Sequence, residues 1–106
     1  MESPFLAMQR VEGQVKTLLR QIDFETLEQA ERKAAASLRR LVVDTRLDIR
    51  DYELSETRAE QLAKAKDARK RLQKLQKSIL AAGDAFGPAD VAQLSAELEQ
   101  INGRII

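Results

Sequence analysis

The longest stretch without glycine or proline covers residues 14–82 and reads QVKTLLRQIDFETLEQAERKAAASLRRLVVDTRLDIRDYELSETRAEQLAKAKDARKRLQKLQKSILAA. It is rich in Leu, Ala, Glu, Gln, Lys and Arg, which have high helix propensities. Its apolar residues recur at intervals of three and four, and no useful period-two alternation appears. The stretch therefore predicts helices and no strands.

Four helices are predicted along the chain, and they form one domain over residues 1–106. Their expected ranges are 4–22, 24–53, 56–82 and 88–102. The two central helices would each be about 40–45 Å long at 1.5 Å per residue, which favours a long antiparallel hairpin. The predicted fold class is all-α: an antiparallel helical bundle of three or four helices built around that hairpin.

The boundaries of these helices rest on capping signals. Ser3 and Asp23 are candidate N-caps for the first and second helices. Two overlapping signals, Ser55 and the capping box that begins at Thr57, mark the start of the third helix. Gly83 is expected to end that helix in the left-handed conformation. A continuous helix across either of the first two breaks stays an open alternative.

One face of each predicted helix carries the expected core. These residues are Met8, Val11, Val15, Leu18 and Ile22; Leu27, Ala30, Ala34, Leu38, Leu41, Thr45, Ile49 and Tyr52; Leu62, Ala65, Ala68, Leu72, Leu75 and Ile79; and Val91, Leu94, Leu98, Ile101 and Ile105. Tyr52 is interpreted as a core tyrosine with a satisfied hydroxyl. Phe86 is expected to cover one end of the bundle.

The composition excludes several classes of function. The chain has 106 residues, a net charge of +1, and neither cysteine nor histidine, which excludes disulfides, thiol nucleophiles, Cys/His zinc sites and imidazole catalysis. No Gly-rich phosphate loop is present, and no cofactor is predicted. No signal peptide or membrane span is recognised in the sequence, so a cytoplasmic location is expected.

The second predicted helix has an additional apolar side. Ala36, Val43, Leu47 and Leu54 lie almost opposite its core face. Three large aliphatic side chains in one row form a contiguous patch, and such patches usually mark contact sites. We therefore predict that the chain self-associates through these four residues, most simply as a symmetric dimer. The alternative is that the first or fourth helix of the same chain covers this side.

Basic residues are concentrated in the third helix, since residues 55–82 contain eight basic and three acidic side chains. Lys66, Lys70, Lys74 and Lys77 share one side of it, opposite the Leu/Ile face. This side is a possible anion-binding surface for nucleic acid or another anionic partner. The alternative is a solvated face, which the macrodipole also favours near a helix C-terminus.

Two further patterns in the sequence bear on chemistry. Asp44, Asp48 and Asp51 share a helix side and could hold a hard cation, but alternating arginines favour ion pairs along a solvated face. The size and helix lengths resemble those of the all-helical chorismate mutases in architecture alone. An Arg/Lys-based enzyme of that kind would use residues such as Arg10 and Arg39, together with Lys33.

The leading hypothesis is a non-enzymatic protein–protein interaction module, such as an adaptor, a chaperone-like protein or an assembly subunit, that acts as a homo-oligomer. The alternatives are binding of nucleic acid or an anionic surface through the third helix, and a small all-helical Arg/Lys-based enzyme. Salt separates the first two hypotheses, because phosphate binding weakens steeply between ~50 and 200 mM salt. Apolar helix pairing lacks this dependence.

Overall fold

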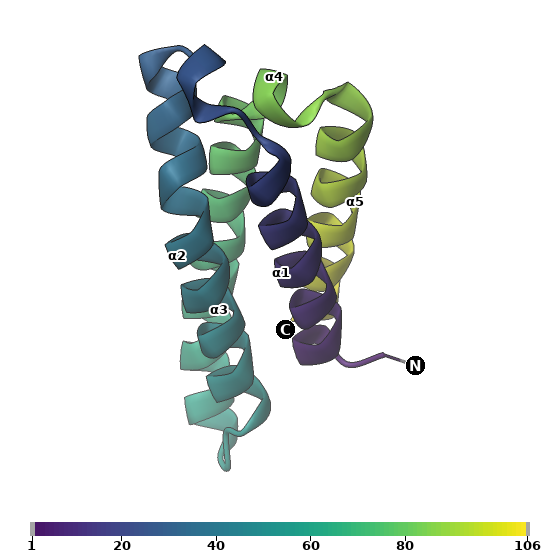
Figure 1. Ribbon diagram of the computed structural model, residues 1–106. Coiled ribbons are helices and arrows are strands. Elements are labelled where there is room, and N and C mark those ends of the chain that lie inside the picture. Colours follow the sequence, from purple (N-terminus) through teal and green to yellow (C-terminus); the bar gives the residue numbers. More distant parts are fainter. Residues whose placement is uncertain (1, 106) are drawn as a thin grey trace.

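The computed structural model describes residues 2–105, which form four long helices and one short one. Figure 1 shows the long helices side by side and the short helix across one end. The elements are α1 (Pro4–Gln21), a 3-10 turn (Phe24–Thr26), α2 (Gln29–Glu53), α3 (Arg58–Ala81), α4 (Gly83–Phe86) and α5 (Pro88–Arg104). No strand occurs within residues 2–105. The predicted all-α fold, a helical bundle built around a long hairpin, is confirmed.

The long helices form a ring in which each one has two neighbours. The α2/α3 hairpin is the largest packing unit, α1 packs on α2, and α5 closes the ring between α1 and α3. Figure 1 shows the tip of the hairpin projecting past the end at which both termini lie. The molecule is accordingly elongated, with principal extents of 48 × 25 × 17 Å.

Local hydrogen bonds explain where α1 and α2 begin. The Ser3 hydroxyl accepts a hydrogen bond from the Leu6 N–H at 3.2 Å, as expected of an N-cap. Asp23 caps the 3-10 turn through the Glu25 N–H at 3.1 Å, and Leu27 then adopts an extended conformation. The second long helix therefore begins at Gln29, later than the predicted residue 24.

The two overlapping signals at the hairpin turn have different roles. Thr57 caps α3 by accepting from the Glu60 N–H at 3.1 Å, and the Glu60 carboxylate accepts in return from the Glu56 N–H at 3.2 Å. Ser55 instead donates to the Asp51 carbonyl at 3.0 Å, in the last turn of α2. The third helix therefore begins at Arg58 and not at 56.

The glycine prediction at the end of α3 was wrong. Gly83 begins the short helix α4, and the left-handed residue is Gly87, with φ 86° and ψ 150°. Helical hydrogen bonding continues through this segment, because the Gly87 N–H donates to the Gly83 carbonyl at 3.0 Å. The chain reverses only at Gly87, just before α5. That helix also runs to Arg104, past the predicted end at residue 102.

The core lies between the four long helices and follows the predicted faces closely. Its buried apolar residues are Ala7, Met8, Val11, Val15, Leu19, Ala35, Leu38, Leu41, Val42, Ile49, Tyr52, Ala65, Ala68, Leu72, Leu75, Ile79, Ala82, Phe86, Leu94, Leu98, Ile101 and Ile105. Thr45 is buried among them and donates its hydroxyl hydrogen to the Leu41 carbonyl at 2.7 Å. Figure 1 shows α4, which ends with the buried Phe86, lying across one end of the bundle.

Some expected core residues lie outside it. Ala30 is exposed, and five others are only half-buried and pack against the margin of the core: Leu18, Ile22, Leu27, Ala34 and Val91. Leu62 is 48% exposed although it continues the apolar face of α3. The C-terminal end of α5 reaches α3 at Arg69, whose guanidinium donates to the Ile105 carbonyl. The first turns of α3 belong to the projecting hairpin tip and lack that neighbour, so Leu62 stays exposed.

Two glycine substitutions are expected to change stability in opposite directions. Gly13 lies inside α1, and apart from the adjoining helix backbone nothing lies within 4 Å of the position that a Cβ would take there, so Gly13→Ala is expected to stabilise the fold by roughly 0.5–1 kcal/mol. Gly87→Ala places a side chain at φ 86° and is expected to cost about 1–3 kcal/mol. Thermal unfolding of both variants checks this. A shift of both melting temperatures in the same direction would contradict the backbone assignment.

Candidate functional site

The outer face of α2 is the surface turned away from the bundle core. Ala36 and Leu54 on this face are exposed, Leu54 by 69%, and Val43 and Leu47 are half-buried. The structure thus places the four residues of the predicted self-association patch in one row on the outside of α2. A shallow hollow of about 430 Å³ lies along this row and is lined by Ala36, Arg39, Arg40, Val43, Asp44 and Leu47.

Ion pairs to the neighbouring helices mark the two edges of this face. On one edge the Arg46 guanidinium lies 3.1 Å from the Glu12 carboxylate of α1. On the other edge, Asp48 accepts from Arg71 of α3 at 2.9 Å. Because α1 and α3 pack at the edges and α5 closes the opposite side of the ring, these helices leave Ala36 and Leu54 exposed and cover Val43 and Leu47 only in part.

Charged side chains surround the apolar row. Arg40 pairs with Asp44 at 3.3 Å, and Arg50 lies 3.7 Å from Asp51. Arg39 is exposed and makes no ion pair or hydrogen bond with any described residue. The outer face of α2 therefore combines an apolar centre with a free guanidinium at its border.

The basic side of α3 is also on the surface. Lys66, Lys70, Lys74 and Lys77 are all exposed, and none forms an ion pair with a described residue. Lys70 and Lys74 line an open hollow of about 450 Å³ together with Asp48, Asp67 and Arg71. The carboxylates of Asp48 and Asp67 reduce the positive charge of this hollow. The edge of the basic side that is nearest to α2 therefore carries both acidic and basic groups.

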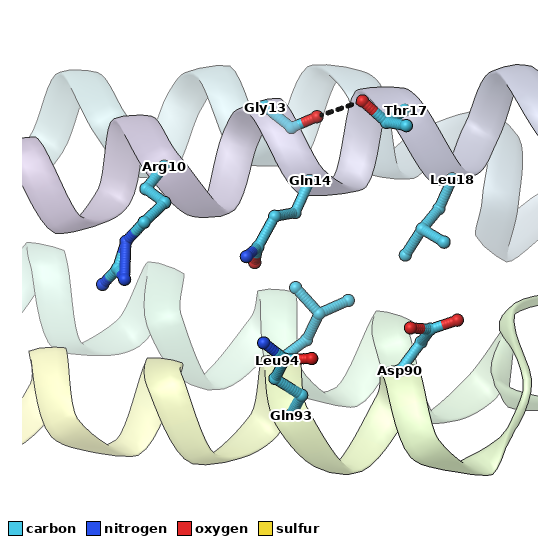
Figure 2. Close-up of a pocket in the computed structure, with 8 residues that line it drawn as sticks. All are labelled: Arg10, Gly13, Gln14, Thr17, Leu18, Asp90, Gln93 and Leu94. Carbon is cyan, nitrogen blue, oxygen red and sulfur yellow. Dashed lines mark hydrogen bonds between the residues drawn. The ribbon is translucent and has the colours of Figure 1, made fainter.

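A third surface feature, which sequence reasoning missed, is a groove between α1 and α5. It has a volume of about 530 Å³ and is lined by Arg10, Gly13, Gln14, Thr17, Leu18, Asp90, Gln93 and Leu94. Figure 2 shows Arg10 toward one end of the groove and Asp90 toward the other. Two features of the sequence could have indicated this groove: Gly13, which has no side chain to fill space within α1, and Leu18, which the helix periodicity places at the edge of the core.

The polar groups of this groove are already engaged or dispersed. The Thr17 hydroxyl donates to the Gly13 carbonyl at 2.9 Å, and Arg10 lies 3.0 Å from Glu2 and 3.9 Å from Glu97. The Gln14 side-chain oxygen is buried without a hydrogen-bond partner among the described residues. The groove offers amides and single charges, but no pair of titratable groups placed for acid–base chemistry.

The cation and enzyme sites considered as alternatives gain no support from the arrangement of side chains. Asp44, Asp48 and Asp51 each face an arginine, and the described residues contain no group of three or more carboxylates that could hold a metal ion. Arg10 lines the α1/α5 groove, whereas Arg39 borders the outer face of α2. The structure does not bring these two arginines to one pocket.

No family model, no curated protein and no solved structure matches this chain. Within residues 2–105, no helix has the length and apolar character that a membrane span requires.

Proposed function

We propose that this protein is a non-enzymatic protein–protein interaction module that acts as a homo-oligomer, most simply a dimer. An adaptor, a chaperone-like protein or an assembly subunit would each use such a module. The observation that carries the proposal is the apolar row on the outer face of α2, in which Ala36 and Leu54 are exposed and Val43 and Leu47 are partly exposed in a single chain. The cytoplasmic location expected from the sequence is part of the same proposal.

The size of the row supports a moderate affinity. Full burial of one aliphatic side chain contributes roughly 1.5–3 kcal/mol. Val43 and Leu47 are already half-buried in one chain, and Leu54 is 69% exposed, so Leu54 gains the most on association. Association itself costs about 4–15 kcal/mol in lost freedom. A single helix–helix seam of this kind is therefore expected to give a weak dimer, with a dissociation constant no tighter than the micromolar range.

A matched pair of leucine variants tests the proposal. Leu54→Lys is expected to raise the dissociation constant of the dimer about tenfold or more, because each 1.4 kcal/mol lost is about a factor of ten. Leu80→Lys is the control, since Leu80 is similarly exposed, at 59%. Leu80 lies on the same side of α3 as Arg69 and Gln76. The side chains of these two residues contact Ile105 and Glu99 in the C-terminal part of the chain, so this side of α3 is remote from the outer face of α2.

Sedimentation equilibrium of the wild type and the two variants gives the dissociation constants. Equal constants for Leu54→Lys and Leu80→Lys would contradict a contact through the outer face of α2.

A second candidate function is electrostatic binding of nucleic acid or another anionic surface by α3. It is favoured by the four lysines Lys66, Lys70, Lys74 and Lys77, which make no ion pair with a described residue. If they contact phosphates, replacing all four by Gln should weaken binding equally for all sequences and flatten the salt dependence. Fluorescence anisotropy with duplex and single-stranded DNA measures both. Absence of wild-type binding at ~50 mM salt would end this candidate.

A further inference from the structure

The outer face of α2 has the residue spacing of a coiled-coil seam. Its positions follow one another at intervals of four and three, which is the a/d pattern of two helices that insert side chains into holes formed by four residues. The d positions are Ala36, Val43 and Arg50, and the a positions are Arg40, Leu47 and Leu54. A second helix laid along this face would therefore contact one continuous row.

The two flanks of this seam carry opposite charges. Arg39 and Arg46 occupy g positions on the flank toward α1, where Arg46 pairs with Glu12. Asp44 and Asp51 occupy e positions on the flank toward α3, where Asp44 lies 3.9 Å from the Arg71 guanidinium. Side chains at e and g positions pair between helices and set their orientation. The charges of these flanks therefore bear on how a second helix would lie.

The orientation of a second copy of α2 determines which flanks meet. With a two-fold axis parallel to α2, the α1 flank of each copy faces the α3 flank of the other. Arg39 then lies opposite the partner's Asp44, and Arg46 lies opposite the partner's Asp51. With the axis perpendicular to α2, the helices run antiparallel and each flank faces its own copy. Arginine would then face arginine, and such like-charge contacts are unfavourable.

The spacing along α2 fits the parallel orientation in detail. Asp44 follows Arg39 by five positions, and Asp51 follows Arg46 by five positions. This is the offset at which a g residue meets an e residue of a parallel helix in register, because the two lie on either side of the same seam residue. The two-fold axis repeats both pairs on the other side of the seam, so that charge complementarity covers both of its edges.

Each of these pairs would join a more available side chain to one that its own chain already holds in place. Arg39 is exposed and makes no ion pair or hydrogen bond with a described residue of its own chain. It meets the partner's Asp44, whose own chain places Arg40 at 3.3 Å. The Asp51 side chain is 44% exposed and meets the partner's Arg46, which Glu12 holds at 3.1 Å.

The hollow on α2 consists of two consecutive holes of this seam. The hole for an a residue is formed by positions d, g, a and d, and the hole for the following d residue by positions a, d, e and a. Together these positions are Ala36, Arg39, Arg40, Val43, Asp44 and Leu47, and the same six residues line the hollow of about 430 Å³. In a parallel pair in register, the hollow would receive the partner's Arg40 and Val43.

Two arginines within the seam lower its affinity. Arg40 and Arg50 would each lie near the same residue of the partner. The Arg40 side chain is 85% exposed and lies 3.3 Å from Asp44, and Arg50 lies 3.7 Å from Asp51. An aspartate at the edge therefore offsets each of these charges in part. A polar residue in the seam costs stability but fixes the register, which agrees with a weak dimer of defined geometry.

We infer that two copies of this chain pair in parallel and in register through α2, with Arg39 and Arg46 of each copy facing Asp44 and Asp51 of the other. This inference rests on the proposed self-association and specifies its partner and register. It also assigns Arg39 a role in choosing the orientation, since this side chain meets a carboxylate across the seam only when the two helices run in the same direction.

Cysteine cross-linking tests the register directly, because the chain contains no native cysteine. Ala36→Cys and Leu54→Cys chains are oxidised with copper–phenanthroline, each alone and as an equal mixture. Each variant alone is expected to form a disulfide-linked dimer, because identical positions face each other within the Cα distance of about 7 Å that a disulfide allows. The mixture is expected to give no 36–54 product, since these positions lie about 27 Å apart at 1.5 Å per residue.

Leu80→Cys is the control for random collisions, because Leu80 is 59% exposed and lies on α3, outside the seam. It is expected to cross-link much less than either seam variant. A 36–54 product from the mixture, or equal cross-linking of all three variants in a sample that sediments as a dimer, would overturn the parallel register and leave self-association standing. A wild type that stays monomeric would overturn both.

Removal of one charge gives a second measurement that does not depend on cysteines. Arg39→Gln is expected to raise the dissociation constant at least about threefold at low salt, because two exposed pairs are lost per dimer. Lys66→Gln is the matched control, since it removes the same charge from an exposed position on α3. Sedimentation equilibrium measures both variants. Equal dissociation constants would overturn the pairing of Arg39 across the seam.

Discussion

Replacing Leu75 with alanine is expected to lower the free energy of unfolding by about 2–5 kcal/mol, the usual cost of removing a buried leucine side chain. Leu75 is 0% exposed and lies in the middle of the α3 face that packs into the bundle. A domain of this size has a total stability of about 5–15 kcal/mol, so the loss is a large part of the whole.

Leu80→Ala is the matched control for this core substitution. Leu80 is on the same helix, only five residues further along, but is 59% exposed. Its replacement is expected to change the unfolding free energy by less than about 0.5 kcal/mol. Urea unfolding followed by circular dichroism, at one protein concentration, measures both variants. Similar unfolding midpoints for the two would contradict the packing of α3.

The double substitution Val43→Lys/Leu47→Lys is expected to convert the proposed dimer into a folded monomer. Both side chains lie at the centre of the outer face of α2, where lysine can extend into solvent from a monomer. In a dimer formed through this face the same two changes would bury four ammonium groups, and unpaired buried charges are strongly unfavourable. Sedimentation equilibrium gives the mass, and circular dichroism gives the helix content.

A charge-matched control separates the position of the lysines from their charge. Gln73→Lys/Gln100→Lys adds the same two positive charges at exposed positions on α3 and α5, and it is expected to keep the dimer. If the Val43/Leu47 variant unfolds without first dissociating, the row belongs to the core of a single chain, and the proposed interface is wrong.

Local chemistry made much of the fold predictable from the sequence. The Ser3 cap, the break before α3 and the long hairpin all follow from residues that act on neighbours within four positions. The start of α2 did not follow in the same way. Asp23 can cap either an α-helix or a 3-10 turn, so this residue alone does not show which of the two follows it. The extended conformation of Leu27 ends the 3-10 turn and delays the start of α2.

Features that depend on contacts between helices were less predictable. Leu62 has the periodicity of a core residue, but its exposure depends on where α5 ends relative to α3. The reversal at Gly87, and not at Gly83, depends on the packing of α4 over the bundle end. The α1/α5 groove depends on how far two helices separate, which no spacing along one helix specifies.

The candidate interface was predictable because it lies on a single helix. Periodicity alone places Ala36, Val43, Leu47 and Leu54 on one side of α2. The sequence left open whether α1 or α5 covers that side. The buried apolar face of α2 sets where α1 and α3 pack, and the ion pairs of Glu12 and Arg71 lie at the two edges of the row, beside it and not over it.

Sedimentation equilibrium of the wild-type protein over a range of concentrations tests the central claim most directly. The account predicts a mass that rises from the 12.0 kDa of one chain toward twice that value, with half of the transition in the micromolar range. A mass that stays at 12.0 kDa at concentrations up to ~100 µM, where a micromolar dimer is well populated, would contradict it.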